Sequence, residues 1–174
     1  MIEWPWDKAQ TDDSYEPGKF MRHSELQPGC APLGIVTAGL ADDELEILAE
    51  ALDYAITGPD GAISHVPIAV LSESDLRLRL RDVLAKISER DSVLPERPCR
   101  PRAPLVMLSG FSSVTTSAIV RALKSAGLRG GEGGDQPPMF AVAVPNALEK
   151  SLRILIDEID GDHQANTEMQ QGAL

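Results

Sequence analysis

The order of apolar runs and helical patterns in this chain occurs twice. Each half has a short apolar run, a helical pattern, a second apolar run and a second helical pattern. Shifting the sequence by 72 residues superposes the halves without a gap, and matches fall on apolar positions, caps and turn residues: Pro32 on Pro104, Ile47 on Ile119, Gly58 on Gly130, Leu80 on Leu152. A unit of about 60 residues buries little surface alone. We therefore predict an α/β fold, in which a tandem duplication of a β-α-β-α unit forms a small pseudo-symmetric sheet flanked by helices.

Short apolar runs bounded by Pro and Gly predict buried strands at residues 32–37, 66–71, 104–108 and 139–144. Apolar residues at helical spacing predict helices at residues 41–55, 74–87, 113–128 and 146–159. Ser74 and Asn146 stand where the N-caps of the second helices are expected. The predicted domains are an extended N-terminal arm (1–31), a first repeat (32–91), a proline-rich linker (92–103), a second repeat (104–164) and a frayed tail (165–174).

The N-terminal arm lacks periodicity, yet it holds four of the seven aromatic residues of the chain: Trp4, Trp6, Tyr15 and Phe20. A disordered tail seldom carries so many aromatic side chains. One interpretation is that these rings strap the arm onto its own domain. The other is that they dock on a partner protein, because buried Trp and Tyr dominate the energetics of interfaces.

The charge of the chain disfavours binding to nucleic acid. There are 16 Lys and Arg against 27 Asp and Glu, a net charge of −11. Phosphate backbones repel such a chain unless a local basic patch overrides the balance. No apolar run approaches the roughly 20 residues of a membrane span, and the N-terminus lacks the pattern of a secretory signal. We expect a soluble protein without membrane insertion.

The two cysteines, Cys30 and Cys99, form neither a disulfide framework nor a metal-ligand spacing. We expect reduced thiols in a reducing compartment, which is the cytoplasm, or an organelle matrix or stroma if the chain is a processed form. The alternative is a single disulfide bridge, since each cysteine precedes an equivalent predicted strand.

The second half resembles a known family. The residues that carry the resemblance are the strand at 104–108 followed by Ser109-Gly110-Phe111, and the strand at 141–144 followed by Pro145-Asn146. They are similar to the small α/β family catalogued as domain of unknown function 3783, over about residues 104–163. The first half departs from this pattern and would be a diverged copy. Because the family has no assigned activity, the resemblance implies a fold and leaves function open.

Small and hydroxyl residues follow the first strand of each repeat, at the expected N-terminus of a helix. In the second repeat they are Ser109, Gly110, Ser112 and Ser113, and in the first they are Thr37 and Gly39. Free backbone N–H groups and hydroxyls in such a place can bind an anion or a small molecule. The alternative is that they only cap a helix, since neither nucleotide-binding fingerprint is present.

Prolines recur every third residue in the linker, at Pro95, Pro98 and Pro101, with arginines between them. This period matches polyproline II. The segment is therefore either a stiff spacer between the repeats or a docking strip for an aromatic-lined groove of a partner.

No catalytic residues, metal ligands or cofactor are predicted. None of the three histidines has an evident catalytic or metal-binding partner, which favours a non-catalytic role without excluding an enzyme. The helix predicted at 41–55 is acidic without a base and its counterpart at 113–128 is basic without an acid, so self-association is a further possibility. The favoured function is a protein-interaction module, an adaptor or an assembly factor. The alternatives are a small-molecule or anion-binding domain, which could be enzymatic, and a weak nucleic-acid binder.

Overall fold

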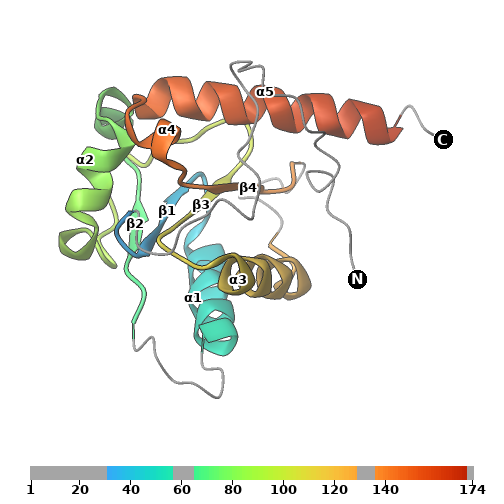
Figure 1. Cartoon of the computed structure of the whole chain (residues 1–174), viewed down its shortest axis with the longest axis horizontal. Helices are drawn as coiled ribbons and strands as arrows, with labels where there is room; N and C mark the ends of the chain where they lie inside the picture. The colour runs from blue at the N-terminus through green and yellow to red at the C-terminus, as the bar shows by residue number, and fades with distance from the viewer. Residues whose placement is uncertain (1–30, 57–64, 129–135, 172–174) are drawn as a thin grey trace.

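The computed structural model describes residues 31–56, 65–128 and 136–171, and its elements form a mixed α/β fold around one sheet (Figure 1). The strands are β1 (Gly34–Ala38), β2 (Ile68–Val70), β3 (Leu105–Ser109) and β4 (Met139–Val142). The α-helices are α1 (Asp42–Ile56), α2 (Leu80–Ala85), α3 (Ser113–Ala126), α4 (Pro145–Leu148) and α5 (Leu152–Gln171), and the 3-10 helices are η3 (Glu73–Arg77) and η4 (Ile87–Glu89). The α/β class and all four predicted strands are confirmed.

The four strands form a single sheet in the order β2-β1-β3-β4. Each outer strand is parallel to its inner neighbour, whereas the inner strands β1 and β3 run antiparallel. Both inner strands are buried at every position because helices cover both faces of the sheet. The antiparallel central pair therefore places the carboxyl ends of β1 and β3 at opposite ends of the sheet.

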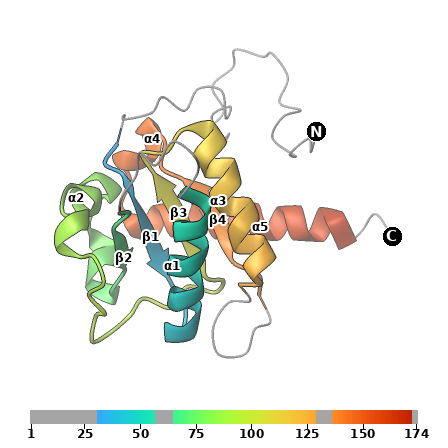
Figure 2. The same cartoon turned by 90° about the horizontal axis from the view of Figure 1, so that it is seen from below.

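The sheet separates two hydrophobic cores. Helices α1 and α3 lie side by side on one face, and α2, α4 and α5 cover the other (Figures 1 and 2). Alternate residues of β1 point to opposite faces, so Ile35 packs toward α1 and α3 while Val36 packs toward α2 and α5. The sheet is thus the middle of three layers.

The second helix of each half is broken where a single helix was predicted. In the first half it divides into η3, α2 and η4, and in the second into α4 and α5. Between the pieces, Leu78 and Arg79 are extended, and Arg79 forms an antiparallel bridge with Ser151. The N–H of Leu80 donates to the carbonyl of Lys150 at 3.1 Å, and the N–H of Leu152 donates to the carbonyl of Leu78 at 2.9 Å. These extended residues connect the two halves by reciprocal backbone bonds that a continuous helix could not make.

The predicted caps and the C-terminal boundary also differ. Ser72, rather than Ser74, precedes the first turn of η3, and α4 begins after Val144 with Pro145 in its first turn, so Asn146 is not its N-cap. Helix α5 continues to Gln171, beyond the predicted end of the repeat at residue 164. No described helix combines the length and the apolar character needed to cross a membrane.

Candidate functional site

The loop after β3 holds two of the predicted ligand-binding residues, and the incoming chain fills it. The Ser109 hydroxyl is buried and donates to the carbonyl of Pro32 at 2.7 Å. Gly110 has φ +78°, and a Cβ on it would lie 2.8 Å from the carbonyl oxygen of Ala31 and from Cα of Leu33. Both residues therefore secure the segment that leads into β1, which explains the Ser-Gly pair by close packing.

The loop after β1 is packed in the same way. Gly39 has φ +77°, and a Cβ on it would lie 3.1 Å from the Pro101 ring. Thr37 is fully buried, and among the described residues its hydroxyl has no hydrogen-bond partner. Because β1 and β3 are antiparallel, with Gly34 opposite Ser109, the Thr37 and Ser109 loops lie at opposite ends of the sheet. The structure thus does not bring the two predicted loops into one site.

Ser112 begins helix α3 as its N-cap. Its Oγ accepts a hydrogen bond from the N–H of Thr115 at 3.2 Å and lies 2.9 Å from the Thr115 hydroxyl. This bond satisfies one of the N–H groups that a helix leaves unpaired in its first turn. The capping interpretation of this residue is therefore realised in the structure.

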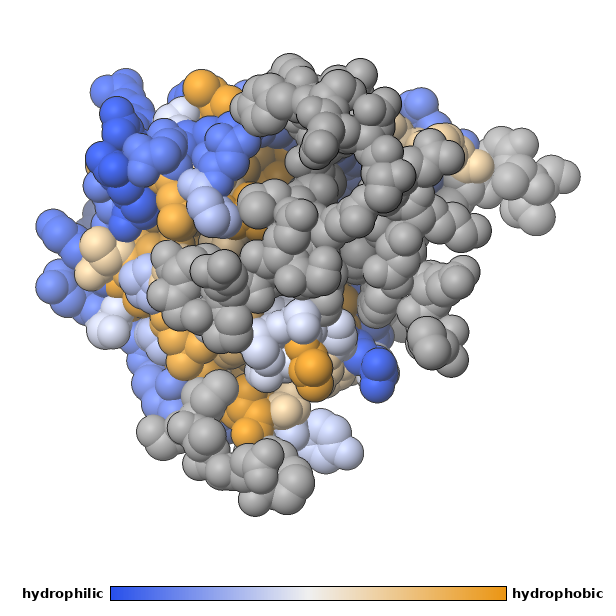
Figure 3. Space-filling view, viewed as in Figure 1, coloured by the Kyte–Doolittle hydropathy of each residue, from blue (hydrophilic) through white to orange (hydrophobic). Residues whose placement is uncertain are grey.

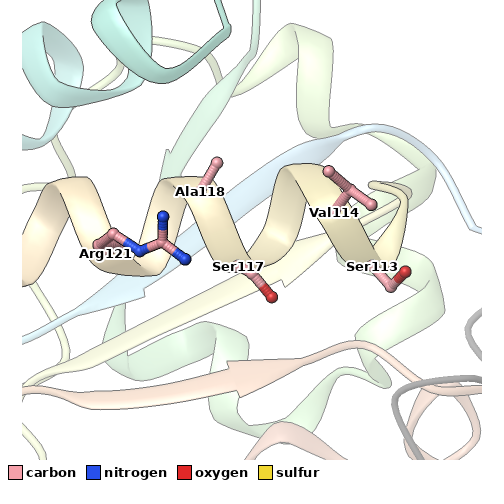
Figure 4. Close-up of a pocket in the computed structure, with 5 residues that line it drawn as sticks. All are labelled: Ser113, Val114, Ser117, Ala118 and Arg121. Carbon is pink, nitrogen blue, oxygen red and sulfur yellow. The ribbon is translucent and has the colours of Figure 1, made fainter. Parts of the chain in front are cut away.

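Ser113 belongs to a hollow of about 440 Å³ on the outer side of α3. Its described lining residues all come from that helix: Ser113, Val114, Ser117, Ala118 and Arg121 (Figure 4). The spacing of Ser113, Ser117 and Arg121 places two hydroxyls and a guanidinium along one helix face. No described carboxylate pairs with Arg121, so this face offers a positive charge next to small polar side chains.

The proline-rich linker lies against the domain at two points. The N–H of Glu73 donates to the carbonyl of Arg97 at 3.2 Å, and the N–H of Cys99 donates to the carbonyl of Leu71 at 2.8 Å. Pro98 is exposed and Pro95 and Pro101 are half-buried, while bends at 96–97 and 102–103 interrupt the extended course. The linker is therefore an anchored surface segment rather than a free spacer.

The linker also contains exposed apolar side chains that the sequence analysis did not single out. Val93 is 56% exposed and Leu94 is 58% exposed. They directly precede the anchored stretch and belong to the same strip as Pro98. The aromatic residues of the arm, Trp4, Trp6, Tyr15 and Phe20, lie outside the described residues, as does Cys30.

A buried ion pair next to the linker was not predicted either. The Asp75 carboxylate accepts hydrogen bonds from the N–H and the hydroxyl of Ser72, at 2.8 and 2.7 Å, and pairs with Arg90 at 2.9 Å. Burial alone would raise the pKa of Asp75, but the Ser72 hydrogen bonds and the Arg90 charge outweigh it and lower that pKa. Asp75 and Arg90 thus hold η3 to the turn after η4, a structural task.

The Cys99 thiol is buried near the same cluster. Burial raises its pKa, and the nearby carboxylates of Glu73 and Asp75 raise it further. A thiol held in its protonated form is a poor nucleophile. Within the described residues, moreover, no group of three or more His, Cys, Asp or Glu side chains could hold a metal ion.

The region from β3 onward decides the comparison with known families. Residues 104–165 match the family described as Domain of unknown function (DUF3783). The DUF3783 match spans β3, α3, β4, α4 and most of α5, and it confirms the resemblance seen in the sequence. No curated protein and no solved structure matches the chain significantly. The DUF3783 description carries no activity, so the case for function depends on the surfaces described above.

Proposed function

We propose that the chain is a non-catalytic protein-interaction module, an adaptor or assembly factor, and that residues 93–98 form part of its docking surface. The observation that carries this proposal is the exposure of Val93, Leu94 and Pro98 directly beside an anchored backbone. Apolar side chains that are already held in place lose less conformational entropy on binding than those of a flexible loop. The partner is another protein, and the arm residues Trp4, Trp6 and Tyr15 are proposed to contribute to the same function.

The surface view is consistent with a local contact. In Figure 3, apolar atoms appear among hydrophilic ones on the described part of this face, without one broad apolar area. Interfaces commonly have a few apolar anchors surrounded by a polar rim. The arginines of the linker, Arg97, Arg100 and Arg102, are exposed and would supply such a rim.

Capture of partners from native lysate tests the proposal. We expect the full-length chain to retain a stoichiometric partner, and the double variant Val93→Ser/Leu94→Ser to retain at least about tenfold less of it, because two interface anchors are lost. The matched control is Val114→Ser/Ile154→Ser, which also replaces two exposed apolar side chains, on α3 and α5. The proposal fails if the wild-type chain retains no partner or if the control loses as much.

The proposed fold history is a tandem duplication of the β-α-β-α unit with pseudo-two-fold symmetry. Three contacts support it, because each joins residues at matching positions of the two halves: the pair Val36–Met107, the bridge Arg79–Ser151, and the reciprocal bonds at Leu80 and Leu152. The register also repeats, since Ile35 pairs with Ile68 as Val106 pairs with Phe140. An offset of 72 matches the outer strands, whereas β1 and β3 match at 71, which takes Gly39 to Gly110.

A second candidate function is binding of an anionic ligand at the hollow on α3. It is favoured by Arg121, which has no described acidic partner, and by the hydroxyls of Ser113 and Ser117 beside it. We expect a ligand that uses this site to raise the melting temperature of the wild-type chain and not that of Arg121→Gln. Equal stabilisation of both chains by phosphate or citrate would contradict a site at Arg121.

The proposed location is a reducing compartment. The buried thiol of Cys99 supports it, because a disulfide at this position would require an incoming sulfur to reach a side chain that is 5% exposed.

A further inference from the structure

The two outer strands of the sheet differ in how their free edges are treated. Alternate residues of a strand direct their backbone groups to opposite sides, and Leu71 bonds inward to β1, so Ile68 faces outward. Its N–H donates to the carboxylate of Asp91 at 2.9 Å, and its carbonyl accepts from the N–H of Ser92 at 3.3 Å. Ser92 adopts φ +60°, a conformation uncommon for a serine, and His65 contacts the other Asp91 oxygen at 2.6 Å. The chain therefore closes the edge of β2 with its own residues.

The edge of β4 has no such closure among the described residues. Met139 and Ala143 bond inward to β3, so Phe140 and Val142 face outward. No described group hydrogen-bonds to their outward N–H or carbonyl. The reason lies in the following helix: the chain after α2 turns back at Ser92, whereas α5 continues to Gln171 and extends past the sheet (Figure 1). Exposed strand edges are sites where another strand adds.

The chain that leads into β1 starts at the end of this edge. Ala31 is buried, its carbonyl oxygen lies against Gly110, and Pro32 accepts the Ser109 hydrogen bond at 2.7 Å. Strands β3 and β4 are parallel, so Ser109 and Val142 belong to the same end of the sheet. On the other side of the molecule, the segment that leads into β3 contacts Gly39 through Pro101 after it has closed the edge of β2. The segments that precede the two inner strands thus take similar paths, and only the one before β3 has a described edge partner.

We propose that residues 20–27 of the N-terminal arm add to the outer edge of β4 as a fifth strand. This stretch contains neither Pro nor Gly, whereas Pro17 and Gly18 precede it and Pro28 and Gly29 follow it. Its eight residues fall within the usual length of a strand. The edge position lies two strand spacings from β3, about 10 Å, and residues 28–30 span about 10 Å when extended. The three residues that separate the proposed strand from Ala31 therefore suffice to place it.

Amide hydrogen exchange of the full-length protein, followed by NMR, tests the proposal. Adjacent residues of a strand point their N–H groups to opposite sides, so of the variants Ser24→Pro and Glu25→Pro at least one removes a pairing donor. We expect Phe140 and Val142 to exchange at least about tenfold more slowly in the wild type than in the more disruptive proline variant. The control variant Asp12→Pro changes the arm outside the proposed strand and should leave both rates unchanged. The Ile68 amide, bonded to Asp91, is the internal reference for an intact fold.

Two results would overturn the proposal. The first is that Phe140 and Val142 exchange equally fast in the wild type and in both proline variants. The second is protection that survives both proline substitutions and grows with protein concentration, which would identify a second copy of the chain as the occupant of the edge.

Discussion

Val36 and Met107 lie opposite each other at the centre of the antiparallel pair that joins the two halves of the sheet. Each stands three residues before a glycine with positive φ, Gly39 at +77° and Gly110 at +78°. Both side chains are buried and belong to the same hydrophobic core. A residue position that faces its own counterpart is what a two-fold relation between duplicated units requires, which is the reason that this pair carries weight in the proposed duplication.

Gly110 gives a sharp test of how the first strand is held. Gly110→Ala would introduce a Cβ 2.8 Å from the backbone of Ala31 and Leu33, and also force a non-glycine residue into φ +78°. Gly127→Ala is the matched control, because Gly127 has φ +76° with nothing within 4 Å of the added Cβ. We expect Gly127→Ala to lower the free energy of unfolding by about 1–2 kcal/mol, and Gly110→Ala to lower it by clearly more, as measured by urea denaturation. Similar losses for both variants would show that close packing at Gly110 contributes nothing.

Local patterns were sufficient to predict the strands and the first helix of each half. Apolar runs bounded by Pro and Gly gave β1 and β3, and helical spacing gave α1 and α3. The uniform offset of 72 was wrong for this part: Leu48, not Ile47, holds the fully buried position that corresponds to Ile119. One residue of length difference between the halves lies in the connection that precedes each outer strand.

Contacts between distant segments account for what the sequence did not reveal. The break after η3 depends on the bridge between Arg79 and Ser151, which are 72 residues apart and carry no local signal for an extended pair. The separation of the Thr37 and Ser109 loops follows from the antiparallel direction of the inner strands, which the order of elements alone leaves open. The Asp75–Arg90 ion pair could have been sought as a capping acid near Ser72, but its cation lies fifteen residues further along the chain.

The two buried hydroxyls beside the sheet should respond to removal in opposite directions. Thr37 has no described hydrogen-bond partner, so Thr37→Val removes an unpaired buried polar group with little change of shape, and we expect the free energy of unfolding to rise by about 1 kcal/mol. Ser109 donates to Pro32, so Ser109→Ala leaves that carbonyl unpaired and should lower the free energy of unfolding by about 1 kcal/mol. Thermal and urea unfolding of both variants measure this difference, and destabilisation by Thr37→Val would contradict it.

Cys99 should behave as an inert thiol in the folded protein. Burial and nearby carboxylates raise its pKa, so little thiolate is available and reagents reach it poorly. In a Cys30→Ser background, we expect the thiol to react with a disulfide reagent at neutral pH at least about a hundredfold more slowly than in the urea-unfolded chain. Rapid reaction of the native protein would show that the segment around Cys99 opens readily.

The Asp75 cluster predicts how stability changes in acid. Its folded-state pKa lies below the ordinary value of 3.8, so the carboxylate contributes stability above that value and loses it as the pH falls toward the lowered pKa. Asp91, whose pKa burial would raise but the Ile68 and His65 hydrogen bonds lower, acts in the same direction. We expect Asp75→Asn to reduce the urea midpoint at pH 7 and to flatten its decline between about pH 5 and pH 3.

Arg90→Gln separates the ion pair from the hydrogen bonds of the same cluster. It removes the charge that contacts Asp75 at 2.9 Å while the two Ser72 hydrogen bonds stay in place. The pKa of Asp75 should therefore rise but remain below that of an isolated buried carboxyl, and the acid transition should shift to a higher pH than in the wild type. The matched control is Arg81→Gln, which removes an exposed partner of Glu149 and should leave the acid transition where it is. An acid transition that is the same in Arg90→Gln and in the wild type would show that the Ser72 hydrogen bonds alone determine the ionisation of Asp75.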